Sequence, residues 1–126
     1  MAGPGPYRYG SLINVFGLFT RPVVFRAQTG QLGKPYIELP GLGEGQEKLV
    51  LRALAGMGRV RIRSKSNDFG SVTVQFSAGF ESYSLHSNTD KMFIRGEGGG
   101  DEIGAMLSFM RKSGRFRDLD KHKKRA

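Results

Sequence analysis

Alternation of polar and apolar side chains over residues 59–77, RVRIRSKSNDFGSVTVQFS, most constrains what this chain can fold into. Successive side chains of an extended strand point to opposite faces. One face would carry Val60, Ile62, Val72, Val74 and Phe76. The other would carry Arg59, Arg61, Arg63 and Lys65, followed by Ser71, Thr73, Gln75 and Ser77. The turn residues SNDFG between the two runs complete the pattern of a hairpin with one apolar and one cationic face.

Short apolar or alternating runs, bounded by Gly, Pro, Asn and Asp, predict further strands. They cover residues 22–30, 34–41, 80–87 and 91–96, and residues 11–19 are apolar almost throughout. Residues 44–58 suit either a short helix or a strand. We favour a strand, because Leu49, Leu51 and Ala53 alternate and the following AGMG can turn the chain into the arginine-rich run.

A helix is predicted over about 101–113. Ile103, Met106, Leu107 and Met110 fall at i, i+3, i+4 and i+7, the spacing of an apolar stripe on one helix face. Asp101 is suited to the N-cap, and Gly114 marks the end of the helix. This helix would cover the apolar face of the predicted hairpin and leave its cationic face in solvent.

The expected fold class is α+β. We expect a mostly antiparallel, strongly curved sheet or incomplete barrel of about seven to eight strands, with the C-terminal amphipathic helix and a basic tail. A flexible leader (1–10), a single domain (11–113) and a flexible tail (114–126) would divide the chain. The β-β-β-β-α order of the second half resembles single-stranded-nucleic-acid modules such as the Whirly and coactivator-type folds. That resemblance rests on element order alone.

The charge of the chain favours polyanionic partners. Its 20 Lys and Arg outnumber 11 Asp and Glu, for a net charge of +9. Residues 111–126 hold eight of the cations and only two of the acids. Such a balance is typical of proteins that bind nucleic acid and, second, acidic membrane surfaces.

Residues for catalysis or metal binding are sparse. The chain has no Cys and only two His, His86 and His122, and its carboxylates show no recurring ligand spacing. The GEGGGDE run at 96–102 lacks the Lys-Ser/Thr ending of a phosphate-binding loop. His86 shares a strand face with Ser82 and Ser84, and we expect it in solvent. We therefore expect a protein that is not an enzyme and that needs no metal and no cofactor.

The candidate binding residues form two groups. Arg59, Arg61, Arg63 and Lys65, at every second position of one strand, could follow a phosphate backbone. Phe69, in the turn, is the best of the aromatic residues for stacking on a base, while Phe80 and Tyr83 are expected in the core and Phe93 is a further candidate. The tail would add salt-dependent affinity through Arg115, Arg117, Lys121, Lys123, Lys124 and Arg125.

Together these features predict a non-catalytic, intracellular nucleic-acid-binding protein that favours single-stranded DNA or RNA. Two alternatives stay open: a virion or phage assembly protein with a basic tail facing the packaged nucleic acid, and a PH-like module that binds a phosphoinositide or peptide. No apolar run is long enough for a transmembrane segment. Phe16, Leu18, Phe19 and Val23 would be buried in a homo-oligomer.

Overall fold

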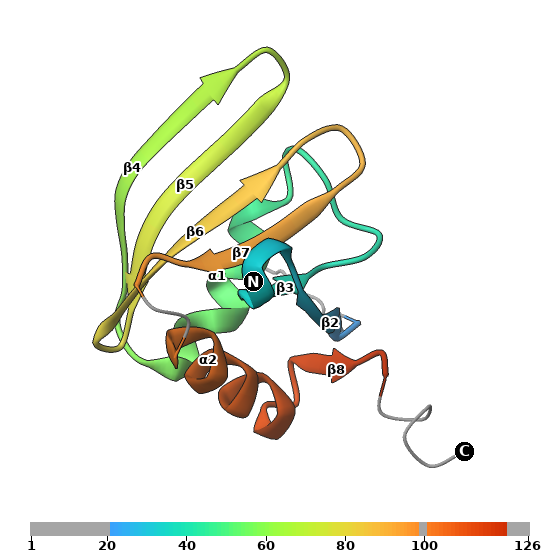
Figure 1. Cartoon of the computed structure of the whole chain (residues 1–126), viewed down its shortest axis with the longest axis vertical. Helices are drawn as coiled ribbons and strands as arrows, with labels where there is room; N and C mark the ends of the chain where they lie inside the picture. Colours follow the sequence, from blue (N-terminus) through green and yellow to red (C-terminus); the bar gives the residue numbers. More distant parts are fainter. Residues whose placement is uncertain (1–20, 99–100, 121–126) are drawn as a thin grey trace, which may run out of the picture.

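A computed structural model describes residues 21–98 and 101–120. These residues form an α+β fold in which a mixed sheet of seven strands carries two α-helices (Figure 1). The predicted leader, the apolar run at 11–19 and the end of the tail lie outside the described residues. Within the part described, no helix is long and apolar enough to cross a membrane.

The sheet has the order β4-β5-β6-β7-β3-β2-β8 and is open, with β4 and β8 at its edges. All neighbours are antiparallel except β2 and β8, which are parallel. The sheet is therefore mixed and is not a closed barrel. The strands are β2 (Val23–Thr29), β3 (Pro35–Glu38), β4 (Val60–Asp68), β5 (Ser71–Ala78), β6 (Glu81–Ser87), β7 (Met92–Gly96) and β8 (Phe116–Asp118).

The segment that we favoured as a strand is helical. Residues Glu47–Ala53 form α1, and the 3-10 helix η2 (Leu54–Met57) continues it. Val50 and Leu54 are fully buried, as the i, i+4 spacing of a helix allows. Leu49, part of the alternating pattern that suggested a strand, is 44% exposed. The alternation was therefore a chance feature of a helix too short to show its period clearly.

Both helices pack on the same face of the sheet. The hydroxyl of Ser87, on the apolar face of β6, donates a hydrogen bond to Glu47 of α1. The hydroxyl of Tyr83, on the same face of β6, donates a hydrogen bond to the backbone carbonyl of Glu102 in α2 (Asp101–Lys112) at 2.8 Å. The stripe predicted for α2 is confirmed, since Ile103, Met106 and Met110 are fully buried. These contacts place the core between the helices and one sheet face.

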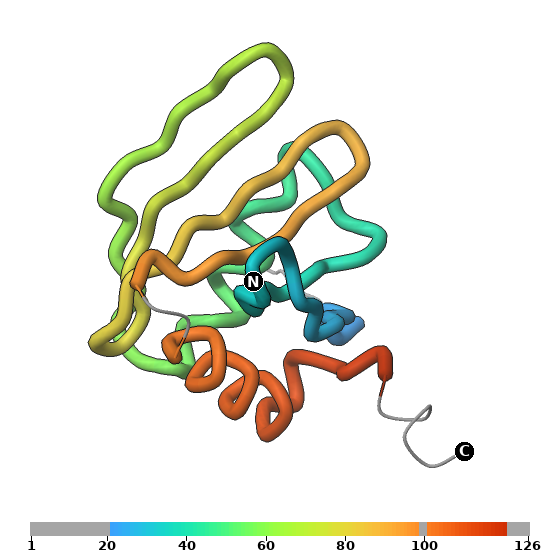
Figure 2. The backbone as a smooth tube through the Cα atoms, in the orientation of Figure 1, coloured from blue at the N-terminus to red at the C-terminus, as the bar shows by residue number. Residues whose placement is uncertain are grey.

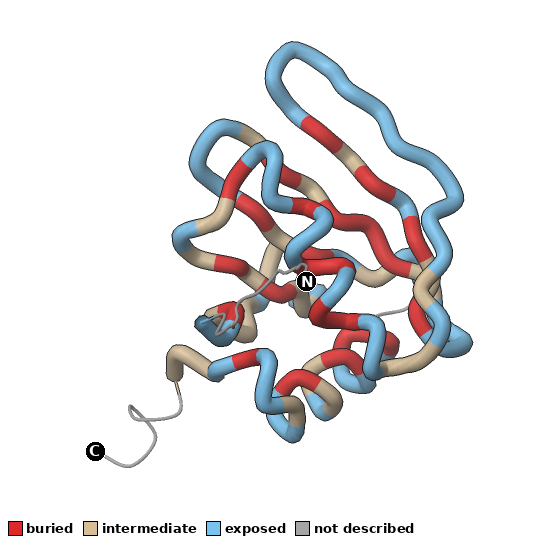
Figure 3. Tube along the Cα trace, turned by 180° about the vertical axis from the view of Figure 1, so that it is seen from behind, coloured by how far each residue is buried: buried red, intermediate tan, exposed pale blue. Residues whose placement is uncertain are grey.

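The β4–β5 hairpin extends beyond this core. Residues 61–71 are all exposed, and the tube in Figures 2 and 3 shows the hairpin projecting from the body with its far half in solvent. Val72, Val74 and Phe76 are buried as predicted, but Ile62 is 58% exposed, because β4 is an edge strand that neither helix covers. The helix thus covers only part of the predicted apolar face.

The described fold continues past the predicted domain end. Phe116–Asp118, which we placed in a flexible tail, form β8 beside β2. Phe116 is buried and lies edge-on to Phe25 and Phe109, with ring centroids 6.2 Å and 6.1 Å apart. Val23, which we assigned to a subunit interface, is buried here in the chain's own core. The buried ring and the pairing with β2 together anchor a segment whose composition resembles a tail.

We therefore expect Phe116→Ala to lower the free energy of unfolding by about 3 kcal/mol, because it removes a buried ring and leaves a cavity. Urea denaturation followed by circular dichroism measures this. Arg117→Ala, one residue along the same strand but exposed, is the control, with an expected change within about 0.5 kcal/mol. Equal, small effects of the two substitutions would show that β8 contributes nothing to the fold.

Candidate functional site

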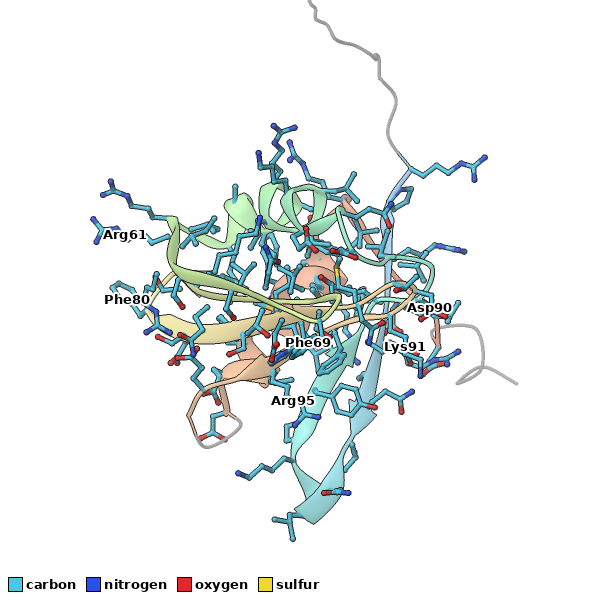
Figure 4. The ribbon with its side chains drawn as sticks, turned by 90° about the horizontal axis from the view of Figure 1, so that it is seen from above. Arg61, Phe69, Phe80, Asp90, Lys91 and Arg95 are labelled. Carbon is cyan, nitrogen blue, oxygen red and sulfur yellow. The ribbon has the colours of Figure 1, made fainter. Side chains whose placement is uncertain are left out.

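The face of the sheet opposite the two helices, which we call the open face, carries mostly polar and aromatic side chains. Cross-strand partners point to the same side of a sheet, so the pairing registers identify its members. They are Arg61, Ser64, Ser66, Asp68, Ser71, Thr73, Gln75, Ser77, Ser82, Ser84, His86, Phe93, Arg95, Tyr36, Glu38, Arg26 and Gln28. No helix of residues 21–98 or 101–120 packs on this face. Figure 4 shows Arg95 on the side of the sheet away from α1.

A cluster of three rings and one guanidinium lies at the centre of the open face, on β6, β7 and β3. The His86 and Phe93 rings stack with centroids 5.0 Å apart, and Tyr36 meets Phe93 edge-on at 5.9 Å. The Arg95 guanidinium carbon lies 5.2 Å from the Phe93 ring centre and 5.7 Å from that of Tyr36. These distances are in the range of cation–π attraction. The cluster thus presents π surfaces and a cation at one place.

A groove of about 890 Å3 runs beside this cluster along β3 and β7. Tyr36, Phe93 and Arg95 line it, and two exposed lysines, Lys34 and Lys91, come from the turns at its opposite ends. Asp90 and Glu38 also line it. Glu38 accepts a hydrogen bond from Gln28 at 2.9 Å and pairs with Arg26 at 3.8 Å. The groove therefore combines aromatic walls with cations, and one of its two carboxylates is already engaged.

We expected His86 in solvent, but it is half-buried. Its Nδ1 lies 3.3 Å from the Thr73 hydroxyl, and its ring is covered by Phe93. Burial, and then the nearby charge of Arg95, lower the pKa of His86 below its ordinary value of 6.5. The imidazole is therefore neutral at pH 7 and acts as a flat, uncharged surface in the cluster.

The predicted row of four cations is broken. A β-bulge between Ile62 and Ser64 inserts Arg63 as an extra residue in β4. Because a bulge shifts the register by one residue, every later side chain changes face. Ser64 and Ser66 consequently pair with Gln75 and Thr73 on the open face. The sequence gives no sign of this shift, since the alternation itself continues through the bulge.

Each of the four cations consequently has a different environment. Arg59 precedes β4 and is exposed, and Arg61 lies on the open face opposite Ser77. Arg63 pairs with Glu97, which also accepts a hydrogen bond from Ser84 at 3.0 Å. Lys65 lies on the helix side, opposite Val74. One strand of nucleic acid cannot follow all four along a single face.

Lys65 is close enough to α1 for its charge to act on the carboxyl of Glu47. Burial raises the pKa of this carboxyl, but hydrogen bonds from Ser87 and from the backbone N–H groups of Glu47 and Gly45 outweigh burial, and the charge of Lys65 adds to them. The pKa of Glu47 consequently lies below its ordinary 4.5. Lys65 thus acts on the helix side of the sheet.

The remaining candidates are spread over the molecule. Phe69 is fully exposed at the β4–β5 turn, while Tyr83 is buried as predicted. Phe80, which we assigned to the core, is also fully exposed, at the β5–β6 turn. Arg115 and Arg117 lie at the β8 edge, across the whole sheet from Arg61 on β4. Lys121, Lys123, Lys124 and Arg125 lie outside the described residues.

Sequence reasoning missed Tyr36, Arg95 and the two groove lysines. Phe93 and Arg95 are two residues apart on one strand, so their shared face was visible in the sequence. What brings Tyr36 beside them is the pairing of β3 with β7, which joins segments more than fifty residues apart, Tyr36 lying opposite Arg95. No local sequence pattern predicts that pairing.

Comparison with known protein families, with curated proteins and with solved structures finds no match to this chain. Among the described residues, no three His, Asp or Glu side chains gather where they could hold a metal ion. The functional argument therefore rests on the geometry of the open face.

The pKa of His86 makes a testable prediction about stability. Because the unfolded imidazole titrates near 6.5 and the folded one lower, the unfolded chain binds the proton more tightly. Stability should be fully present above about pH 6.5 and should decline as the pH falls through that value toward the folded pKa.

Urea unfolding at several pH values between about 5 and 8 measures this decline. The background is His122→Gln, which leaves one histidine, and the matched variant adds His86→Gln. An NMR titration of the single imidazole gives the folded pKa directly. A folded pKa at or above 6.5, or the same decline in the His86→Gln variant, would contradict the assignment.

Proposed function

We propose that this protein is a non-catalytic binder of single-stranded nucleic acid, and that the open face is its binding surface. The observation that carries the proposal is the central cluster, where Tyr36, His86, Phe93 and Arg95 gather on a sheet face that no described helix covers. Proteins that bind single strands combine aromatic stacking platforms with a cationic groove. The groove between Lys34 and Lys91 supplies the second part.

Single-stranded ligands suit this surface better than duplexes. An unpaired base exposes its π face, which can stack on a ring or on a guanidinium plane, whereas a duplex offers mainly its phosphates and groove edges. Arg95 can serve both parts, because its guanidinium stacks and also forms bidentate contacts with phosphate. The strong positive charge of the whole chain would speed association with any polyanion.

Two acids of the open face are paired with arginines, which reduces their repulsion of an anionic ligand. Glu97 pairs with Arg63, and Glu38 with Arg26 and Gln28. The sequence suggested Arg63 as a phosphate contact. In this account it instead offsets the charge of a carboxylate beside the binding surface. Arg61, at the β4 edge of the same face, stays a candidate phosphate contact.

The test compares the affinity of the wild type and of Lys91→Gln/Arg95→Gln for a labelled oligodeoxythymidine over a range of salt concentrations. Each lost phosphate contact on a single strand lowers the slope of log K against log salt by roughly 0.7, so we expect a slope smaller by about 1.4 together with weaker binding. Fluorescence anisotropy measures both quantities.

Lys48→Gln/Arg52→Gln is the matched control, since it removes the same charge from exposed positions on α1. It should leave most of the affinity intact. Equal losses in the two double variants would show that charge alone, and not the open face, determines binding. Tighter binding to duplex or to phosphoinositide vesicles than to the oligonucleotide would instead favour one of the rival functions.

A homo-oligomer remains part of the proposal. The exposed β4 edge could pair with another chain, but its cations and its bulge are features that natural sheets use against edge pairing. An interface would therefore more readily use surfaces other than the β4 edge. Light scattering coupled to size-exclusion chromatography, with and without oligonucleotide, measures the oligomeric state.

A further inference from the structure

The tip of the β4–β5 hairpin is a two-residue turn in which Phe69 and Gly70 both have positive φ. Phe69 is fully exposed, with a relative accessibility of 102%, and its backbone is left-handed, with φ of 48°. Bulky residues rarely adopt that conformation, which Gly and Asn tolerate far better. The position thus carries conformational strain and an exposed ring, and no described residue packs on that ring to offset either.

No other described position combines these features. Leu32 is also left-handed and 94% exposed, but it has no ring. Phe80 is as exposed as Phe69, yet the positive φ of its turn is taken by Gly79, so Phe80 itself is unstrained. Strained residues are concentrated where a protein grips a ligand. The two-residue turn accounts for the positive φ of Phe69, but it does not account for an exposed ring at that position.

The surroundings of Phe69 favour a polyanion with exposed bases. On the hairpin itself, Lys65 lies on the helix side near the tip, whereas Arg61 lies at the far end of β4, opposite Ser77. Asp68 beside Phe69 is acidic, but the net charge of the chain is +9. A second copy of the same edge would bring like charges together. The hairpin tip also lies at the same end of the sheet as Lys91, because the β4–β5 and β6–β7 turns share that end (Figure 1).

We propose that the β4–β5 hairpin is an arm that reaches past the open face and stacks Phe69 on an unpaired base of the nucleic acid held there. This inference rests on the proposed function and adds a second contact to it, outside the groove. Figure 4 looks onto the hairpin, with Phe69 near the centre of the view, Lys91 to its right and Arg95 below it. The ligand would leave the Lys91 end of the groove and pass the arm.

The chain has no Trp, so a single substitution makes the tip spectroscopically visible. We would add an oligodeoxythymidine of about fifteen nucleotides, within the range that single-strand-binding folds cover, to the full-length Phe69→Trp variant. Stacking should quench its indole fluorescence. Phe80→Trp places the same probe at an equally exposed turn at the other end of the sheet and should stay unquenched. Heparin, a polyanion without bases, should quench neither.

A second variant separates the role of the ring from the fold. Phe69→Asn removes the ring and relieves the strain, so thermal stability should be unchanged or higher while affinity for the oligonucleotide falls about tenfold. Because stacking releases no counterions, the salt slope should stay as in the wild type. That pattern differs from the one expected for Lys91→Gln/Arg95→Gln, which changes the slope.

The outcomes distinguish this inference from the proposed function. The wild type could bind tightly while Phe69→Trp shows no quenching, or while Phe69→Asn keeps full affinity. Either result would reject the arm and leave the open-face proposal intact. No binding by the wild type would reject both. A blue shift of the Phe69→Trp emission on anionic lipid vesicles, without any response to oligonucleotide, would assign the tip to a membrane and overturn the inference.

Discussion

The arrangement of this molecule depends on the burial of only one face of its sheet. Apolar side chains alternate with polar ones along β5, β6 and β7, and both helices cover the apolar side. Removing that side from water is the main gain in folding, at roughly 25 cal/mol per Å2 of apolar surface. Because α1 and α2 share one face, the polar face remains without a cover among the described elements. The possible binding surface is thus a consequence of where the core lies.

A sheet face left in water must still satisfy its charges and hydroxyls, and this limits which of its residues can meet a ligand. Ion pairs and hydrogen bonds engage Arg63, Glu97, Glu38 and Arg26 with one another across strands. Exposed pairs of this kind add at most about 1 kcal/mol each to stability. Their more important effect is on the surface potential, because Glu38 and Glu97 are each matched by an arginine. Arg95 instead lies over two rings, where its charge is still directed to solvent.

Alternation predicted the central strands well, because the period of two is enforced wherever one face is buried and the other is wet. It failed where burial ceases. In β4 residues 61–68 are all exposed, so nothing in the core penalises a bulge at Arg63, and the row of four cations was lost. Over 44–58 a helix of two turns is too short for its period to be read reliably. The basic composition around residue 116 predicted a flexible tail, but the burial of Phe116 and the pairing with β2 hold this segment in the fold.

Tyr36 lies in the central cluster because β3 pairs with β7. That pairing joins segments that are distant in the sequence, and no local pattern predicts it.

The two proposed contacts differ in what their rings contribute to the fold. Those of the open face stabilise the sheet through contacts with one another, whereas the ring of Phe69 packs on no described residue. Aromatic rings on a wet sheet face bury less surface than they would in the core, and a left-handed phenylalanine at a hairpin tip buries none. Asn at position 69 would serve the turn at least as well, because it tolerates a positive φ. A sequence that is otherwise consistent with its fold departs from local rules mainly at functional sites. Phe69 at the end of the hairpin is such a departure, and the proposed stacking on a base would account for it.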